Sequence, residues 1–284
     1  MTNKNKYCWL TILTPPGIAA NNRGEGDGGN TSTLQRITIG DKVHTTISSE
    51  SIKWAIREYL GNIYPDKVNR IYDPIVDEYS LKNEEYDETL YVDDDVFGYM
   101  DARKNSKNQD ATTKRRGVVE VNRAISLTAY NGDKFFNSRA GIKNSNALYN
   151  TESHYTRYQY SIGFRLGDFV VADRANLILD AIPNLRHVGG NHSRSLYDYA
   201  PASIIIRITN SPSPLILYSF NEEGKIPEIV RLVEVGDIPP EELILGGQIA
   251  QSNEATILDE KDVVVCGGIM EAINTAKYAL FRKS

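Results

Sequence analysis

The chain has 284 residues, 40% hydrophobic and 24% charged, which is ordinary globular composition and enough for one elaborated domain or two small ones. No apolar run approaches the roughly eighteen residues of a membrane span, and the run near the start is too short for a signal-peptide core. The two cysteines, Cys8 and Cys266, lie in separate apolar runs, which indicates buried strand residues and excludes a zinc site of paired cysteines.

The net charge of −5 is distributed unevenly along the chain. Residues 66–101 carry net −9 and residues 221–262 carry net −8, so subtracting both from −5 leaves +12 on the rest. The acidic net charge of the whole chain argues against nucleic-acid binding. The basic charge outside the two blocks, however, suits contact with phosphate groups. The two acidic blocks are either solvated faces or surfaces that meet basic patches on a neighbouring copy.

The first predicted elements are a strand, a hairpin and a helix. An apolar strand, Tyr7–Leu13, stops at two prolines, and a loop rich in Gly and Asn follows. LQRITI and VHTTIS alternate polar and apolar residues around Gly40, which predicts a β-hairpin. A helix is predicted for Ser49–Leu60, capped by a serine and ended by Gly61. Its apolar stripe consists of Ile52, Ala55, Ile56, Tyr59 and Leu60.

Three further strands and a second helix are predicted beyond residue 117. The strands cover residues 117–128, 158–166 and 203–209, and the helix runs from about Gly167 to Ala181. Without the intervening segments the order is strand, helix, strand, strand, helix, strand. This βαββαβ order is the ferredoxin-like pattern on which RNA-recognition modules are built, so the sequence predicts an α+β fold.

Three polar segments carry groups that suit a phosphate. The loop Asn21–Asn30 has glycines that let backbone N–H groups approach an anion, although no Gly-Lys-Ser/Thr follows as in a P-loop. The predicted helix starts with serines at its positive end, and Lys53 and Arg57 share what we expect to be an exposed face. Gly189–Ser195 is a third such loop. Each segment also has a plainer interpretation. The first would be a flexible loop, the second a capped surface helix, and the third a hydrogen-bonding loop.

Catalytic patterns are weak in this sequence. No Gly-x-Ser-x-Gly elbow or Ser-x-x-Lys motif is present. Asp93-Asp94-Asp95 suits Mg²⁺ in a nuclease, but such a run is more often a solvated edge, which is the interpretation we prefer. Aromatic and basic residues in 129–158 suit stacking with phosphate contact, or a protein interface. The aromatic pair of ordinary RNA-recognition modules is not evident.

These features resemble the DevR-like backbone subunits of CRISPR complexes, above all those of type I-B Cascade. The stretch Leu13–Leu60 resembles the N-terminal signature of that family: a strand, NNRGEGDGGN, a glycine-bearing hairpin and ISSESIKWAIREYL. Asp95-Val96-Phe97-Gly98 resembles its Asp-x-Phe-Gly element, and GGNHSRS resembles its glycine-rich loop after the second helix. The resemblance covers most of residues 7–210, and residues 211–284 match nothing in it.

The resemblance implies an RNA-recognition palm formed by residues 1–60, 118–128 and 158–210. It places a finger-like insertion at 61–117 and a thumb-like β-hairpin insertion at 129–157. Beyond the resemblance, we expect residues 211–284 to be a C-terminal extension that completes the palm.

The implied function is a repeating, non-enzymatic, cytoplasmic subunit that binds CRISPR guide RNA along its sugar-phosphate backbone and presents it to target DNA. The implied partners are further copies of the chain, arranged head to tail, and other Cascade subunits. The resemblance implies no cofactor, no catalytic residue, no metal and no membrane association. The implied RNA-binding residues are Asn21, Asn22, Arg23, Gly24, Arg36, His44, Ser48, Ser49, Ser51, Lys53, Arg57, Arg139, Lys143, Arg157, Gly190, Asn191, His192, Ser193 and Arg194.

Two other functions remain open at this point. Related type III backbone subunits cleave target RNA through a loop aspartate, and Asp27 or Asp95 would take that place here. The chain could also act as a stand-alone autoregulatory nucleic-acid binder without a complex.

Overall fold

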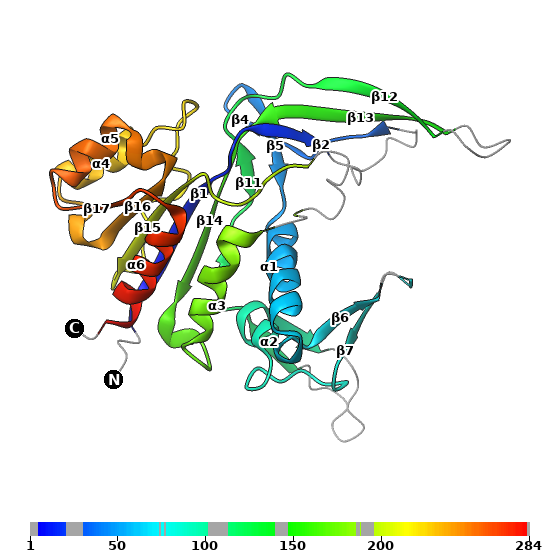
Figure 1. Ribbon diagram of the computed structural model, residues 1–284. Coiled ribbons are helices and arrows are strands. Elements are labelled where there is room, and N and C mark those ends of the chain that lie inside the picture. The colour runs from blue at the N-terminus through cyan, green and yellow to red at the C-terminus, as the bar shows by residue number, and fades with distance from the viewer. Residues whose placement is uncertain are drawn as a thin grey trace.

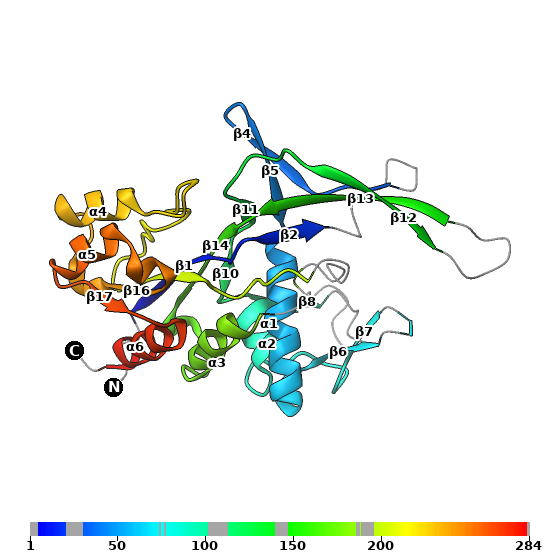
Figure 2. The ribbon, with the colours of Figure 1, turned by 45° about the horizontal axis from the view of Figure 1, so that its top comes forward.

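The computed structural model describes residues 5–20, 31–73, 75–76, 78–101, 113–139, 147–185, 188 and 196–282. Figure 1 shows a wide sheet with helices on both faces and two arms that extend from the same side of it. The arms remain separate when the molecule is turned by 45° (Figure 2). None of the described helices is long and apolar enough to cross a membrane.

Within the described part of the chain the main sheet has nine strands, and its four central strands have ferredoxin-like order. β15, β1, β14 and β11 are antiparallel neighbours, and α1 and α3 are the crossovers between them. The predicted α+β fold with βαββαβ order is therefore confirmed. Across the sheet the strands are β17 (Val264–Cys266), β16 (Leu243–Gly247), β15 (Ser203–Thr209), β1 (Tyr7–Leu13), β14 (Tyr158–Arg165), β11 (Ala124–Ser126), β5 (Lys42–Ile47) and β4 (Arg36–Ile39), with β10 (Glu120–Val121) also paired to β14.

Alternation along β1 divides the core between the two faces of the sheet. Cys8, Leu10 and Ile12 pack in the larger cluster, and Leu13 packs in the smaller one. The larger cluster lies under α1 (Ser49–Ile63), α3 (Arg174–Ala181) and α6 (Ile269–Phe281), and the smaller under α4 (Pro227–Glu234) and α5 (Asn253–Asp259).

Both predicted helix boundaries need correction. The first helix continues past Gly61 to Ile63, and Tyr64 caps it by donating its backbone N–H to the carbonyl of Leu60. The second is shorter than predicted, because Leu166–Asp168 form a 3₁₀ turn and Phe169 is extended, so α3 begins only at Arg174. Phe169 is nevertheless buried in the core against Phe164, and this contact holds the irregular segment in place.

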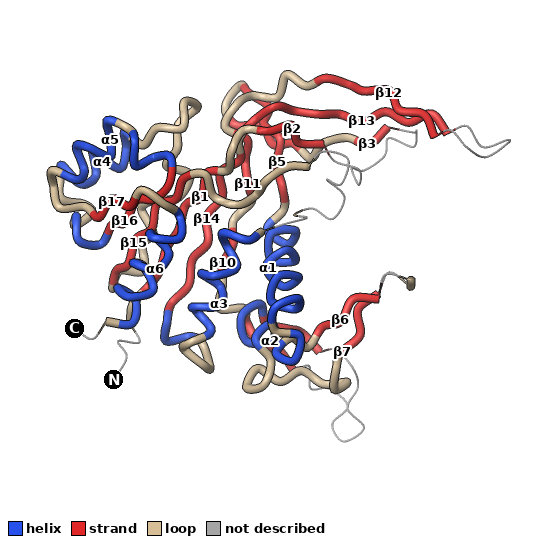
Figure 3. Tube along the Cα trace, viewed as in Figure 1, coloured by secondary structure: helices blue, strands red, loops and turns tan. Residues whose placement is uncertain are grey.

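The described residues between the end of α1 and Gly117 form one arm, and those of 129–139 and 147–157 provide most of the other. Figure 3 shows β2 and β3 beside β13 in the second arm. The finger and thumb roles of these arms remain predictions. The first arm has a 3₁₀ turn (Pro65–Lys67), β6 (Arg70–Asp73) paired with β7 (Glu78–Leu81), α2 (Val92–Phe97), and β8 (Gly98–Asp101) paired with β9 (Thr113–Arg116); the second has β12 (Asp133–Arg139), β13 (Ala147–Thr156), β2 (Gly17–Ala20) and β3 (Thr31–Ser32).

The C-terminal segment continues the main sheet. β16 pairs antiparallel with β15, and β17 pairs parallel with β16, so α5 and α6 flank a short parallel unit. Cys8 and Cys266 are free and buried on β1 and β17, which confirms the prediction of buried strand cysteines. Among the described residues, further 3₁₀ turns cover Ile182–Asn184, Pro240–Glu242 and Gln248–Gln251.

Candidate nucleic-acid interface

The start of α1 holds the three serines proposed as phosphate donors. The Ser48 hydroxyl accepts a hydrogen bond from the backbone N–H of Ser51 at 3.2 Å, which caps the helix. The Ser49 hydroxyl donates to the Glu50 carboxylate at 3.0 Å. The pKa of Glu50 is held below its usual range by a hydrogen bond to its own backbone, by Ser49 and by Lys53. A phosphate at this end would therefore displace existing bonds and meet a carboxylate.

Lys53 and Arg57 lie one helical turn apart but in different surroundings. Lys53 is half-buried, with no hydrogen bond or ion pair to another described residue. The Arg57 Nε lies 3.6 Å from Asp93 Oδ2, and its guanidinium stacks over Phe97 at 4.9 Å. Burial lowers the pKa of Arg57, and nearby Arg70 lowers it further. The prediction of a shared exposed face is therefore wrong for Arg57, which packs inward against the first arm.

Arg36 and His44 lie on the β4–β5 hairpin. Arg36 forms an ion pair with the buried carboxylate of Glu152 and stacks over Tyr130 at 4.2 Å. His44 is buried, and its Nδ1 donates to the backbone carbonyl of Ser126 at 2.8 Å. A neutral His44 then has no N–H left for a phosphate. His44 and Arg36 therefore both have protein partners already, and their roles as RNA contacts remain predictions.

A second histidine, missed by the sequence analysis, lies beside this hairpin. His154 Nδ1 is 2.9 Å from the Thr45 hydroxyl, its Nε2 is 3.3 Å from the Thr128 hydroxyl, and its ring meets Tyr130 edge to face. Burial lowers the pKa of His154, and this outweighs a backbone hydrogen bond at Ala129 that raises it. These neutral contacts fasten β13 to β5 at the base of the second arm.

The remaining predicted contacts are placed only in part. Arg157 is half-buried, with its guanidinium beside Gly224. For Arg139 the structure gives only the backbone, within β12. The others lie outside the described residues: Asn21, Asn22, Arg23, Gly24, Lys143, Gly190, Asn191, His192, Ser193 and Arg194.

Asp95 lies in α2 and is fully buried, contrary to the prediction of a solvated edge. It forms ion pairs with Arg115 and with Arg174, the latter at 2.7 Å, and accepts from the backbone N–H of Val170 at 3.2 Å. Arg174 also donates to backbone carbonyls of the first arm. Asp95 therefore joins the first arm to the start of α3.

The other two aspartates of the triplet are equally buried, and both accept hydrogen bonds from Asn69. Asp93 accepts from the backbone N–H groups of Asn69 at 2.8 Å and Arg70 at 3.2 Å. Asp94 accepts from the Asn69 amide at 2.7 Å, and burial raises its pKa. All three carboxylates are bonded to protein donors, and no group of three or more metal-ligating side chains is placed to hold an ion within the described residues, so the magnesium interpretation is not supported either.

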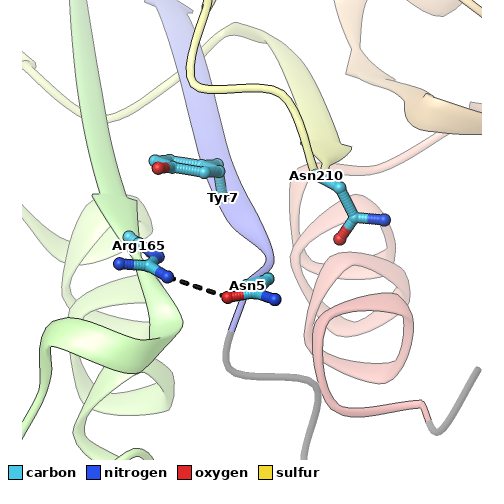
Figure 4. A pocket seen from close by; sticks show the side chains of 4 residues that line it. All are labelled: Asn5, Tyr7, Arg165 and Asn210. Atoms are coloured by element: carbon cyan, nitrogen blue, oxygen red, sulfur yellow. Dashed lines mark hydrogen bonds between the residues drawn. The ribbon is translucent and has the colours of Figure 1, made fainter.

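An aromatic pair that the sequence analysis did not identify lies on β1, on the face away from α1 and α3. Tyr7 and Trp9 stack with ring centroids 5.8 Å apart, and Gly163 leaves room for the indole, because a Cβ there would lie 2.1 Å from it. Below Tyr7 is a hollow of about 400 Å³, where Arg165 donates to Asn5 at 2.8 Å (Figure 4). The alternation Tyr-x-Trp within the first strand was the available signal. This end of β1 lies near the termini and away from the start of α1 (Figure 1).

The middle of the same sheet face is covered by the chain after β15. The Thr11 hydroxyl donates to the carbonyl of Ile216 at 2.6 Å, and the Gln159 amide exchanges two hydrogen bonds with the backbone of Phe220. Ile216 and Phe220 are buried in the smaller core cluster. Bases therefore cannot stack on the centre of this sheet as on an open RNA-recognition sheet.

A family model and a related protein both place this chain in the same family. A family model described as "CRISPR-associated negative auto-regulator DevR/Csa2" matches residues 18–228. A protein of Myxococcus xanthus (strain DK1622), described as "CRISPR-associated protein Cas7/Cst2/DevR", is 36% identical over 280 residues, covering 91% of each chain.

Two solved structures with this fold are chains of RNA-guided assemblies. A chain of a "CRISPR RNA-guided surveillance complex, pre-nicking" superposes with a TM-score of 0.63 at 14% identity, covering 96% of this chain and 100% of that one. A chain of another "CRISPR RNA-guided surveillance complex" gives a TM-score of 0.59 at 15% identity, covering 95% and 99%.

Proposed function

Since the chain belongs to the DevR/Csa2 family of CRISPR-associated proteins, we propose that it is a backbone subunit of a type I surveillance complex and holds guide RNA by its phosphates. The observation that carries this proposal is the likeness along almost the whole chain, both to the Cas7/Cst2/DevR relative and to chains of RNA-guided surveillance complexes. Guide RNA, target DNA paired to it, further copies of the chain and other Cascade subunits are the proposed partners. We place the assembly in the cytoplasm, where a guide meets invading DNA.

The proposed RNA path runs past the start of α1 rather than across the sheet. Lys53 supports this path because it is the cation of that helix with no hydrogen bond or ion pair to another described residue. The covered centre of the sheet also supports it, because RNA held by phosphates needs no stacking surface and leaves its bases free to pair. The loops at residues 21–24 and 190–194 stay in the proposal as further contacts.

We also propose that the subunit does not cleave nucleic acid. Asp95 is fully buried between Arg115 and Arg174, so an RNA strand has no access to its carboxylate. This argues against the type III alternative at Asp95, whereas Asp27 lies outside the described residues. The assembled protein with guide should leave complementary RNA intact in Mg²⁺ or Mn²⁺. Periodic cuts that Asp27→Ala abolishes would establish the alternative instead.

The salt dependence of RNA binding tests the path. Each phosphate contact on a single strand contributes a slope of about −0.7 to a log–log plot of affinity against salt. Lys53→Ala should flatten the slope by about that amount and weaken all sequences alike. Lys261→Ala, a lysine paired with Glu234 in the C-terminal acidic block, is the matched control and should leave the slope unchanged. Equal slopes for both variants would place the RNA elsewhere.

A further inference from the structure

The hollow at the start of β1 has the composition of a small-ligand site, and it lies outside the proposed RNA path. We call it the Tyr7 pocket and define it by the side chains that line it: Asn5, Tyr7, Arg165 and Asn210. Its volume of about 400 Å³ is within the usual range for pockets that hold small molecules. Figure 4 shows the Tyr7 ring above the hollow, between Arg165 and Asn210. An aromatic ring, a cation and two amides therefore meet around one space.

The Tyr7 ring is held in place by its neighbour on β1. Tyr7 and Trp9 are two positions apart on one strand, so their side chains leave the sheet on the same face. Their rings stack with planes only 6° apart, and Trp9 lies over Gly163, where a Cβ would collide with the indole. Trp9 does not line the pocket, so Tyr7 alone presents a ring to it. A supported ring of this kind suits stacking with a planar ligand.

Arg165 supplies a positive charge that protein groups satisfy only in part. Its guanidinium donates to Asn5 at 2.8 Å and lies 5.9 Å from the centre of the Tyr7 ring. Its Nε is buried and has no hydrogen-bond partner in the described part of the chain. The contact between Arg165 and Asp168 is long, 3.5 Å, and the two side chains are 38% and 52% exposed. Because an exposed pair of this kind contributes little, the guanidinium can turn to a phosphate at small cost.

Further positive charge lies at the same end of the sheet. The Lys6 ammonium donates to the carbonyls of Ala279 and Arg282 at 2.7 and 3.0 Å, where α6 ends. Burial lowers the pKa of Lys6, and the nearby charge of Arg282 lowers it further. Neither Lys6 nor Arg282 forms an ion pair with another residue in the described ranges. A metal cation or a basic peptide is therefore disfavoured here, and an anionic ligand is favoured.

A nucleotide with an unpaired base combines the features that these groups recognise. A base can stack on the tyrosine ring, amide side chains can pair with its edge, and an arginine can bind its phosphate. Asn210 is exposed and has no hydrogen bond to another described residue, so its amide is available for a base edge. Bases within a duplex are covered by the neighbouring base pairs, so the ligand must be single-stranded or free.

We propose that the Tyr7 pocket binds one unpaired nucleotide of a single strand, with its base on Tyr7 and its phosphate on Arg165. The pocket lies near the termini, away from the start of α1 where we place the guide phosphates (Figure 1). It uses none of the residues of that path, so nucleotide binding here does not depend on the path. The strand held in the pocket is therefore a different segment of nucleic acid. RNA and DNA share the chemistry of base and phosphate, and the sugar of the bound nucleotide distinguishes them.

The fluorescence of Trp9 reports on the pocket directly. The chain has two tryptophans, so Trp54→Phe leaves Trp9 as the single indole, and all variants are made in that background. AMP, dAMP, adenosine and ribose 5-phosphate are titrated separately onto the protein. Adenosine lacks the phosphate and ribose 5-phosphate lacks the base, so the ligands separate the two contacts. Equilibrium dialysis gives the affinity where a substitution alters the fluorescence itself, and circular dichroism checks that each variant is folded.

AMP should change the Trp9 fluorescence saturably, whereas ribose 5-phosphate should not, and adenosine should bind about tenfold more weakly than AMP. Tyr7→Leu keeps an apolar side chain but removes the ring, so it should weaken AMP by about fivefold or more. Arg165→Gln should lower the affinity for AMP to that for adenosine and leave adenosine unchanged. Arg231→Gln on α4, an exposed arginine paired with Glu228, is the matched control and should change neither affinity.

The absence of a saturable response to both AMP and dAMP in the folded protein would overturn the proposal and assign the pocket to a protein partner. Undiminished affinity of Arg165→Gln for AMP would also overturn it, because the phosphate would then lie elsewhere. If AMP binds as expected, a preference for AMP over dAMP identifies RNA as the strand, and the reverse preference identifies DNA. Equal affinities would support a pocket that accepts either strand.

Discussion

The acidic blocks at residues 66–101 and 221–262 have nearly the same net charge, −9 and −8, but their carboxylates lie in different surroundings. In the first block, the aspartates at 93–95 are fully buried and each has protein partners. In the second block, Glu228 pairs with Arg231 one turn away, and both side chains are more than half exposed. The net charge of a block therefore does not show whether its carboxylates are buried against protein partners or exposed to solvent.

The neighbouring apolar residues account for the difference. The aspartate triplet shares its short helix with Val92 and Val96, which are both buried, so the helix enters the core and carries the carboxylates with it. On α4 the buried residues Ile229, Leu232 and Val233 occupy one stripe, and the charged residues keep the opposite side. The first arrangement needs a partner for every buried charge, whereas the second needs none.

Asp95→Ala should give the largest effect in this comparison. Removing the carboxylate leaves Arg115 and Arg174 without their partner beside the core, and breaking a buried ion pair in this way costs about 3–5 kcal/mol in the free energy of unfolding. Urea unfolding measures the loss. Glu234→Ala in the second block is the control and should leave the midpoint unchanged. A cost below about 1 kcal/mol for Asp95→Ala would remove the distinction between the blocks.

Asn69→Ala should cause the second-largest loss in the free energy of unfolding. Asn69 is fully buried; its amide donates to Glu85 and Asp94, and its side-chain oxygen accepts from the N–H of Lys82. Loss of these bonds should lower the free energy of unfolding by about 2 kcal/mol, because buried groups are left unsatisfied.

Asn221 provides the matched residue in the second block. Its side-chain oxygen accepts from the N–H groups of Glu223 and Lys225, but it is exposed, so water can replace it. Asn221→Ala should therefore cost clearly less than Asn69→Ala in the same urea measurement. Equal costs would show that the two asparagines are equivalent despite their different burial.

The pH dependence should differ in sign between the blocks. Burial raises the pKa of Asp94, so its stabilising contribution is fully present below the unfolded value and is lost as the pH rises through the folded pKa. Asp94→Asn should then be at least as stable as the unsubstituted protein at pH 7, and this advantage should shrink on acidification. The hydrogen bond and charge of Arg231 lower the pKa of Glu228, so any stability from that pair is lost as the pH falls. Urea midpoints measured from pH 7 to pH 4 test both signs.

Glu228→Gln should have the smallest effect. Its pairing with Arg231 lies in water, where salt screens it and side-chain entropy opposes it. The urea midpoint should not change measurably at low or high salt. A clear loss that salt removes would show that the second block has a structural role as well.

Local periodicity was enough to predict much of the fold. The bounds of β1, the β4–β5 hairpin, the start of α1 and β15 all follow from alternation or helical spacing over a few residues. The apolar runs LILGG and VVC also indicate β16 and β17, but the sequence analysis did not place these strands.

The surroundings of single side chains could not be predicted in the same way. Arg57 looked exposed because its own helix leaves that side open, and only the packing of the first arm covers it. Asp95 and Arg174 are 79 positions apart, so no local pattern relates them. The start of α1 was found as a candidate site from its serines and Lys53, but the carboxylate of Glu50 within it only became relevant once its bonds were visible.

The position of β1 in the sheet has a consequence for how the chain is made. β1 lies between β14 and β15, and the bonds of Thr11 to Ser161 and to Ile216 span 150 and 205 positions. At a synthesis rate of about 5–20 residues per second, the first strand waits roughly 8–30 seconds for its first partner. During that time YCWLTIL is an unpaired apolar strand on the ribosome. Nascent chains of this protein are therefore most vulnerable to aggregation before β14 is complete.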